Sequence, residues 1–220
     1  EIKQAFLATE NWMTRVKNFR EERIRAIATQ SWMPNLDVDR SFVLHVLPLV
    51  SQEIQLDIRE NTKLFSSICA FDQYFLQLSN RRFNLEGYQF YMVDGQKCTS
   101  YLQFFRDGSI EFYSTEYFVK RSNDSPVEFQ AMLLEEAMAK LISRYLRCVA
   151  NTSLQPPFVI FLTLSGVAGV QLVTNDRHYS IISRHEFDRN QILIPGFVVD
   201  TFDENIATSI IIISGFWGFG

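Results

Sequence analysis

The side chains best suited to acid–base chemistry or metal binding, the histidines, are few in this sequence. His45 lies inside an apolar run, a position typical of a hydrogen-bonded histidine in a protein core. His178 and His185 lie in a polar segment with Asp176 and Asp188, but their spacing of seven residues matches neither HExxH nor HxxxH. We therefore predict no metal site. A hydrolase or nuclease-like site at these histidines and aspartates is the third of three functional hypotheses.

The sequence also lacks the motifs that mark common catalytic and nucleotide-binding sites. It contains no GxxxxGK[ST] phosphate loop and no GxSxG nucleophile motif. A GxxG at 166–169 lacks the spacing of a dinucleotide fingerprint, so we interpret it as a tight turn. The cysteines, Cys69, Cys98 and Cys148, show no CxxC spacing and are interpreted as reduced thiols of a cytoplasmic protein. We predict no catalytic residue and no cofactor.

Four polar residues close to aromatic strands are the best candidates for contact with a ligand or a partner protein. Arg82 and Asn84 precede one predicted strand, and Gln103 and Arg106 lie in a predicted hairpin. Buried polar side chains need hydrogen-bond partners, which either the protein or a ligand supplies. If these side chains converge on one pocket, ligand sensing is favoured. If each is paired inside the fold, their role is structural.

A second candidate surface is the polar side of the helical sequence at residues 1–29. It carries the nucleic-acid candidates Arg15, Arg20, Arg23 and Arg25. Glu21 and Glu22 interrupt this basic series, so it fits either a solvated helix face or a surface that contacts DNA or RNA phosphates. The net charge of −4 argues against a basic footprint over the whole protein.

Of all these candidates, Gln103 and Arg106 lie in a predicted β-hairpin at residues 100–113. Two aromatic-rich runs flank Asp107-Gly108, a dipeptide that favours a two-residue type I′ turn. That turn predicts the cross-strand pairs Phe105–Ile110, Phe104–Glu111 and Leu102–Tyr113. Both faces of the hairpin are then mainly apolar, so we expect it in the interior of a covered sheet.

Further strands and helices are expected on either side of the hairpin. Buried strands are predicted at 41–49, 84–93 and 158–164, another strand near 197–199, and a low-propensity final helix toward Phe216. The run Ser125-Pro126-Val127-Glu128 combines a capping box with proline at the first helical position, and so predicts a helix from there to about residue 150. Its apolar stripe is Val127, Ala131, Leu134, Met138, Leu141, Tyr145 and Val149.

The predicted fold class is α+β, with a mostly antiparallel mixed sheet, a long helix packed across it and a helical N-terminus. Residues 1–30 are interpreted as a helical lead-in from an upstream domain, and residues 31–220 as a single α+β domain. With 220 residues, of which 47 % are hydrophobic, the chain is long enough to form one core. No apolar run reaches the roughly 18 residues of a membrane span, so no membrane partner is expected.

Seven segments, in this order and spacing, resemble the C-terminal region of prokaryotic proteins that carry an N-terminal Schlafen-type, AlbA-like DNA-binding domain. The segments are FREERIRAI at 19–27, VLHVLPL at 43–49, RFNLEG at 82–87, YLQFFRDGSIE at 101–111, Pro156-Pro157, Ile194-Pro195 and Trp217. The chain begins at Glu1 without a methionine, inside helical sequence. The resemblance implies that the AlbA-like domain lies upstream of Glu1.

The resemblance implies that nucleic acid is a partner through the upstream domain, and it assigns no catalytic residue to this region. Our first hypothesis is a non-enzymatic accessory module, serving ligand sensing, partner binding or homo-oligomerisation in a cytoplasmic regulatory protein. The second hypothesis is direct DNA or RNA binding by the basic helix face together with Arg82 and Arg106.

Overall fold

The computed structural model of the chain describes residues 2–31, 33, 35–49, 55–69, 78–176 and 181–202. The helices in these residues are α1 (Ile2–Ala28), α2 (Thr62–Cys69) and α3 (Ala131–Val149). The strands are β1 (Ser41–Pro48), β2 (Asn80–Phe83), β3 (Gly87–Asp94), β4 (Lys97–Phe105), β5 (Ile110–Ser114), β6 (Phe118–Lys120), β7 (Val127–Gln130), β8 (Phe158–Ser165), β9 (Gln171–Asp176), β10 (Ile181–Glu186) and β11 (Gln191–Val199).

These strands form two sheets. The larger has seven strands in the order β11-β8-β1-β5-β4-β3-β2, and the smaller has four in the order β10-β9-β7-β6. Every neighbouring pair in the larger sheet is antiparallel, and only the β7–β9 pairing of the smaller sheet, among the described residues, is parallel. The α+β class with a mostly antiparallel sheet is confirmed.

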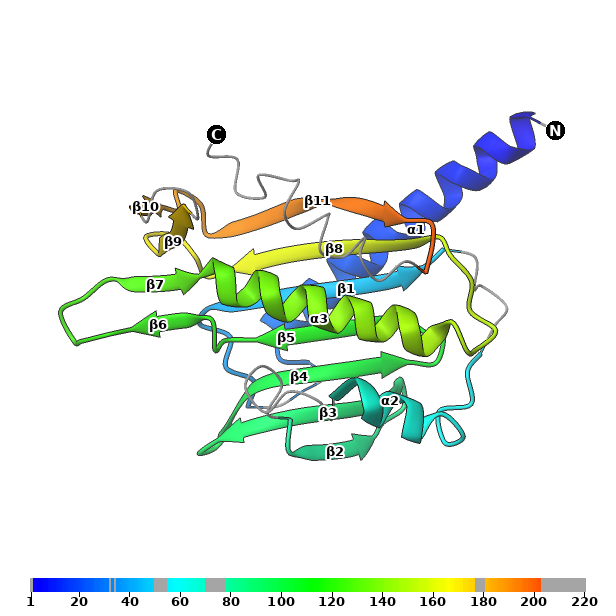
Figure 1. Ribbon diagram of the computed structural model, residues 1–220, viewed down its shortest axis with the longest axis horizontal. Coiled ribbons are helices and arrows are strands. Elements are labelled where there is room, and N and C mark those ends of the chain that lie inside the picture. The colour runs from blue at the N-terminus through cyan, green and yellow to red at the C-terminus, as the bar shows by residue number, and fades with distance from the viewer. Residues whose placement is uncertain are drawn as a thin grey trace.

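Helices cover both faces of the larger sheet. Helix α3 lies across one face with α2 near its edge, and α1 runs behind the opposite face (Figure 1). The strand predicted at 41–49 is β1, which is buried along its whole length because β5 and β8 flank it and helices cover it. In the part of the chain that the structure describes, no helix is long and apolar enough to cross a membrane. The helix predicted toward Phe216 lies outside the described residues.

The central hairpin has a different register from the predicted one. Phe105 and Ser109 enclose a three-residue loop, in which the Phe105 N–H donates to Ser109 O at 2.9 Å and the Gly108 N–H donates to Phe105 O at 3.1 Å. Gly108 has φ +86°, whereas Asp107 has no positive φ, so the turn is a type I turn with a glycine bulge. Asp-Gly serves both turn types, because only glycine needs the left-handed conformation here.

This one-residue shift determines which side chains share a face. The observed pairs are Phe104–Ile110, Gln103–Glu111, Leu102–Phe112 and Tyr101–Tyr113. Alternate pairs therefore lie on opposite faces: the purely apolar ones join the core under α3, and the polar and tyrosine ones face α1. The predicted pair Phe104–Glu111 is wrong, and Glu111 instead lies opposite Gln103.

Helix α3 begins at Ala131, later than the capping box predicts. Residues 127–130 form β7 instead, paired with β6 and β9. Ser125 Oγ accepts from the Ser122 N–H at 2.9 Å and so closes a turn, while Glu128 Oε2 accepts from Arg121 Nε at 2.8 Å. Strand pairing and the burial of Phe129 outweigh the local capping signal. From Ala131 onward the predicted apolar stripe is buried as expected.

Candidate functional site

A cluster of charged and polar side chains is buried between α1 and the sheet. It consists of Arg20, Arg23, His45, Tyr101 and Glu111, and we call it the α1 cluster. Arg23, only 7 % exposed, donates from Nε and Nη2 to the two carboxylate oxygens of Glu111 at 2.9 and 2.8 Å. Its Nη1 donates to both oxygens of Glu86 at 3.0 and 3.1 Å. One guanidinium therefore bridges two carboxylates.

Glu111 is fully buried at the centre of this cluster. It also accepts from Tyr101 Oη at 2.8 Å and contacts His45 Nε2 at 2.8 Å. Burial by itself raises the pKa of a carboxyl, but the charge and hydrogen bonds of Arg23 and the bond from His45 outweigh it and hold the pKa of Glu111 at about 2. An ionised carboxylate only accepts hydrogen bonds, so His45 Nε2 carries the proton that they share. The predicted hydrogen-bonded core histidine is confirmed.

Arg20 lies on the same face of α1 and binds β8 and β11, at the β11 edge of the sheet. Its Nε donates to Thr163 Oγ1 at 3.0 Å, its Nη1 to Ile194 O at 3.1 Å, and its Nη2 to Leu162 O. The guanidinium lies 5.0 Å from the centroid of the Phe161 ring. Burial lowers the pKa of Arg20 to about 10.

The basic face predicted on the first helix is therefore divided. Arg20 and Arg23 point into the sheet, and placing them on a solvated or phosphate-contacting face was wrong. Arg25 is exposed, and Arg15 is half-buried with its Nη2 donating to Pro48 O at 3.3 Å. The spacing contained the signal, because Val16, Arg20, Arg23 and Ile27 recur every three or four residues and all four are buried.

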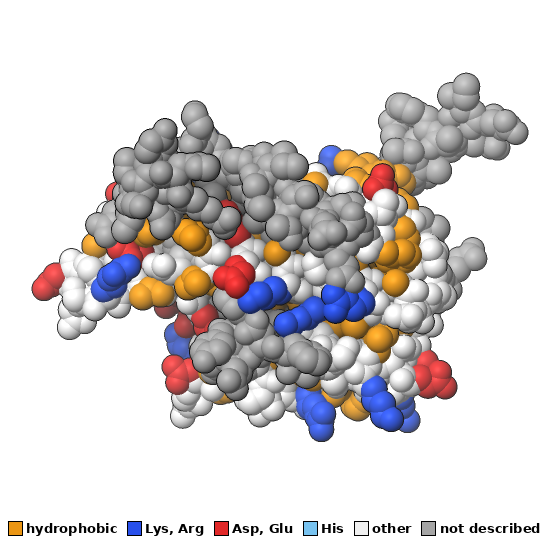
Figure 2. Space-filling view, in the orientation of Figure 1, with side chains coloured by type: hydrophobic (Ala, Val, Ile, Leu, Met, Phe, Trp, Pro, Cys, Tyr) orange, Lys and Arg blue, Asp and Glu red, His pale blue; other side chains and the backbone are white. Residues whose placement is uncertain are grey.

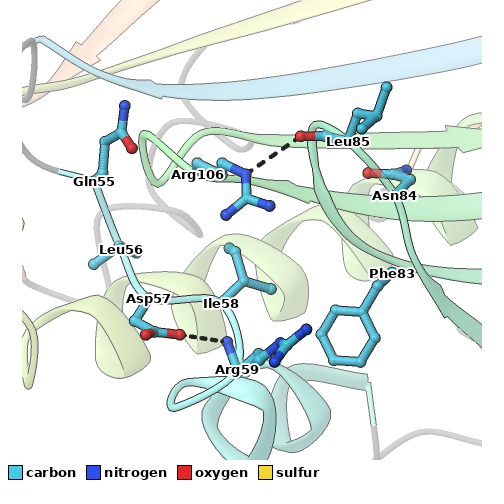
Figure 3. Close-up of a pocket in the computed structure, with 9 residues that line it drawn as sticks. All are labelled: Gln55, Leu56, Asp57, Ile58, Arg59, Phe83, Asn84, Leu85 and Arg106. Carbon is cyan, nitrogen blue, oxygen red and sulfur yellow. Dashed lines mark hydrogen bonds between the residues drawn. The ribbon is translucent and has the colours of Figure 1, made fainter.

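A cleft of about 830 Å³ lies beside the segment that leads into α2, at the end of the sheet where the β2–β3 and β4–β5 turns lie. Its walls are the segment 55–59 before α2, the end of β2 with the turn at 83–85, and Arg106 in the β4–β5 turn (Figure 3). We call it the Arg106 cleft. Backbone hydrogen bonds join these walls: the Leu56 N–H donates to Arg106 O at 2.8 Å and the Arg106 N–H to Glu86 O at 3.1 Å.

The predicted ligand candidates separate into paired and available side chains. Asn84 and the fully buried Gln103 form a reciprocal amide pair, with N···O distances of 2.7 and 3.3 Å. Arg82 Nε donates to Gln89 Oε1 at 2.8 Å, and its guanidinium lies 5.4 Å from the centroid of the Tyr91 ring. Asn84 and Arg106 line the cleft, whereas Arg82 and Gln103 do not. Convergence of all four on one pocket is not observed.

Two guanidinium groups in the cleft have donors that the fold does not use. Arg106 Nε donates to Leu85 O at 3.3 Å, and its Nη atoms make no hydrogen bond within the described residues. The guanidinium of Arg59, a residue that no sequence pattern singled out, likewise makes none there, although the Arg59 backbone N–H donates to Asp57 Oδ1 at 2.8 Å. Figure 3 shows both arginines among the residues that line the cleft, together with Phe83, Leu85 and Ile58.

A second cleft of about 610 Å³ adjoins the first and shares Gln55 and Arg106 with it. Arg15, Phe19 and Glu86 belong to this second cleft. Because Glu86 also binds Arg23, one exposed carboxylate connects the second cleft to the α1 cluster.

The histidine-based enzyme hypothesis gains no support from the described residues. His185 lies in β10 opposite Leu172 and is half-buried, and Asp188 is exposed, 3.7 Å from Arg189 Nε. His178 lies outside the described residues, as does the side chain of Asp176. Within the described ranges, no three His, Cys, Asp or Glu side chains gather in a group able to hold a metal ion. The cysteines are free thiols, and burial raises the pKa of Cys98 to about 11.

Comparison of the chain with models of known families, with curated proteins and with solved structures found no match. The resemblance to the C-terminal region of Schlafen-type, AlbA-like proteins therefore stays a prediction.

Proposed function

We propose that this chain is a non-enzymatic ligand-sensing module and that the Arg106 cleft is its binding site for an anionic ligand. The observation that carries this proposal is the presence of two guanidinium groups, on Arg59 and Arg106, whose terminal donors have no acceptor within the described residues. Guanidinium groups bind carboxylates and phosphates through paired, charge-assisted hydrogen bonds. A cleft of about 830 Å³ is of the size that holds a small molecule.

The carboxylates near the cleft support an anionic ligand, because each already has a partner. Asp57 Oδ1 accepts from the N–H groups of Arg59 and Glu60 at 2.8 and 3.2 Å. Glu86 binds Arg23, and Asp107 Oδ1 accepts from the Ser109 N–H at 2.9 Å. Within the described residues, no ion pair joins these three carboxylates to Arg59 or Arg106, so the terminal donors of both arginines are left for a ligand.

The α1 cluster, in contrast, contains the residue types of an active site, but a substrate cannot reach them. Glu111 and His45 are fully buried, and the carboxylate of Glu111 is held by Arg23, His45 and Tyr101. A catalytic acid or base must come within hydrogen-bond reach of the substrate. The cluster therefore supports a structural role in joining α1 to the sheet.

The proposal also covers the larger protein to which this module belongs. We infer that the module belongs to a regulatory protein that binds nucleic acid through another domain, as the resemblance implies. Direct nucleic-acid binding through the α1 arginines is less favoured, because Arg20 and Arg23 are committed to the sheet. On the face that carries α3, the surface has both basic and acidic side chains (Figure 2).

Thermal unfolding with a panel of anions tests the proposal. The panel is inorganic phosphate, pyrophosphate, citrate and AMP, each at millimolar concentration. We expect at least one anion to raise the melting temperature, because a ligand that binds only the folded state stabilises it by mass action. Arg106→Gln should abolish the rise, whereas Arg25→Gln, at an exposed arginine on α1, should keep it. No rise with any anion, or a rise that survives Arg59→Gln and Arg106→Gln together, would overturn the proposal.

A further inference from the structure

The Arg106 cleft combines its free cations with an exposed aromatic ring. Phe83 lines the cleft at the end of the edge strand β2 and is 56 % exposed. Phenylalanine is usually buried, so an exposed ring at the rim of a pocket is informative. Phe83 and Arg59 both line the cleft (Figure 3).

The Phe83 ring is supported from behind by other aromatic rings. Its centroid lies 4.7 Å from that of Tyr88, and Tyr88 lies 4.9 Å from Phe90. Phe90 contacts Phe104 at 6.0 Å, which in turn stacks on Phe65 of α2 at 4.5 Å. Phe83 is thus the outermost member of a packed aromatic series, and a planar ring placed against it would extend that series toward the cleft.

We propose, building on the anion site above, that the ligand of the Arg106 cleft is a nucleotide. Its base stacks on Phe83, and its phosphate accepts hydrogen bonds from the free guanidinium donors of Arg59 and Arg106. A planar ring joined to a phosphate satisfies both features of the site at once. A cleft of about 830 Å³ suits one nucleotide rather than a longer strand.

The same geometry predicts weak discrimination between bases. Asn84 is the amide side chain nearest to Phe83 along the chain, but its Nδ2 donates to Gln103 and its Oδ1 accepts from the Gly87 N–H at 2.7 Å. Stacking depends on the face of the base, which every base has, and not on its hydrogen-bonding edge. We therefore expect AMP and GMP to bind with affinities within a few-fold of each other.

Isothermal titration calorimetry of the full chain with matched ligands tests the nucleotide assignment. The ligands are AMP, GMP, ribose 5-phosphate, adenosine and a four-nucleotide single strand. We expect AMP to bind roughly ten- to a hundredfold more tightly than ribose 5-phosphate, the range that one stacked base contributes. Phe83→Leu should reduce AMP affinity to that of ribose 5-phosphate and leave ribose 5-phosphate itself unaffected. Phe83→Trp should restore AMP binding.

The matched control is Leu85→Ala, since Leu85 is an apolar residue on the same rim, 96 % exposed and without an aromatic ring. It should leave AMP affinity unchanged. Equal affinity for AMP and ribose 5-phosphate, insensitive to Phe83→Leu, would overturn the nucleotide assignment while the anion site stands. A single strand that binds tenfold more tightly than AMP would reassign the cleft to nucleic acid. No binding of any phosphate compound would overturn the nucleotide assignment, and together with no rise in melting temperature from citrate it would overturn the anion site as well.

Discussion

The two groups of arginines in this protein differ in what their donors do. In the α1 cluster, Arg23 is bound to two carboxylates and Arg20 to the backbone of two strands, and both are buried. In the Arg106 cleft, Arg59 and Arg106 are exposed, and their terminal nitrogens have no acceptor within the described residues. The arginines whose guanidinium nitrogens are all bonded within the protein therefore stabilise the fold. The arginines whose terminal donors have no such acceptor are available to bind a ligand.

The electrostatic setting follows the same division. Burial alone lowers the pKa of an arginine, but Glu111 and its hydrogen bonds raise the pKa of Arg23 above its usual value. The pair remains ionised in a buried environment because each charge stabilises the other. Near the cleft, Asp57, Glu86 and Asp107 have partners other than Arg59 and Arg106, so an incoming anion displaces no ion pair of these two arginines.

The largest expected effect on the free energy of unfolding is in the α1 cluster, where the guanidinium nitrogens of the arginines are all bonded. Arg23→Met leaves the buried carboxylate of Glu111 without its main counter-charge and should lower the free energy of unfolding by about 3–5 kcal/mol. Guanidinium chloride denaturation measures the change. Arg25→Met, at an exposed position on the same helix, should change stability by less than about 0.5 kcal/mol. If the two substitutions lowered the free energy of unfolding equally, the buried Arg23 would contribute no more to stability than the exposed Arg25, and its structural role would be contradicted.

Acid should weaken the α1 cluster. Because the pKa of Glu111 is held at about 2, below the value of an unfolded chain, its ionisation contributes stability above roughly pH 4.5. That contribution, about 3 kcal/mol, is lost as the pH falls toward 2. The stability difference between the wild type and Glu111→Gln should therefore shrink between pH 5 and 2 in urea titrations. A difference that is constant with pH would contradict the burial of an ionised Glu111.

A substitution in the turn that carries Arg106 should have an intermediate effect on stability. A Cβ at Gly108, which has φ +86°, would lie 2.3 Å from Leu154 Cδ1 in the core. Gly108→Ala should therefore lower stability by about 2–3 kcal/mol, through backbone strain and overpacking. Gly95 also has a positive φ, +58°, but open space around it, so Gly95→Ala should cost only about 1 kcal/mol. Thermal unfolding of both variants measures the difference, and the reverse order would argue against the observed turn.

The smallest effect on stability is expected at the cleft. Arg59→Gln and Arg106→Gln remove exposed side chains with few contacts, and each should change the free energy of unfolding of the ligand-free protein by less than about 0.5 kcal/mol. Guanidinium chloride denaturation without added ligand gives this value. A loss above 2 kcal/mol at either position would place these arginines with the structural group.

Much of the fold follows from local sequence, and the exceptions have identifiable causes. The buried strand β1 could be predicted because its apolar residues form one continuous run, and the apolar stripe of α3 because its residues recur with helical spacing. The start of α3 could not be predicted, because Glu128 and Phe129 pair with the neighbouring strand β6 and with β9, which is distant in sequence. The hairpin register was ambiguous, since Asp107-Gly108 suits two turn types that differ by one residue.

The candidate site was harder to predict from the sequence than the fold. Arg106 was singled out from its position in an aromatic hairpin, but Arg59 lies in a segment without a distinctive pattern. Both residues line one cleft because β2, β3 and β4 pair side by side and the Leu56 N–H donates a hydrogen bond to Arg106 O. Such long-range convergence is absent from any local window of the sequence.

The most direct test of the division between the two arginine groups is the thermal unfolding of the Arg106→Gln protein, with and without saturating AMP. We predict that without AMP it melts at the wild-type temperature, and that AMP, which raises the melting temperature of the wild type, no longer does so. A melting temperature well below the wild type without AMP, or an undiminished rise with AMP, would contradict the account.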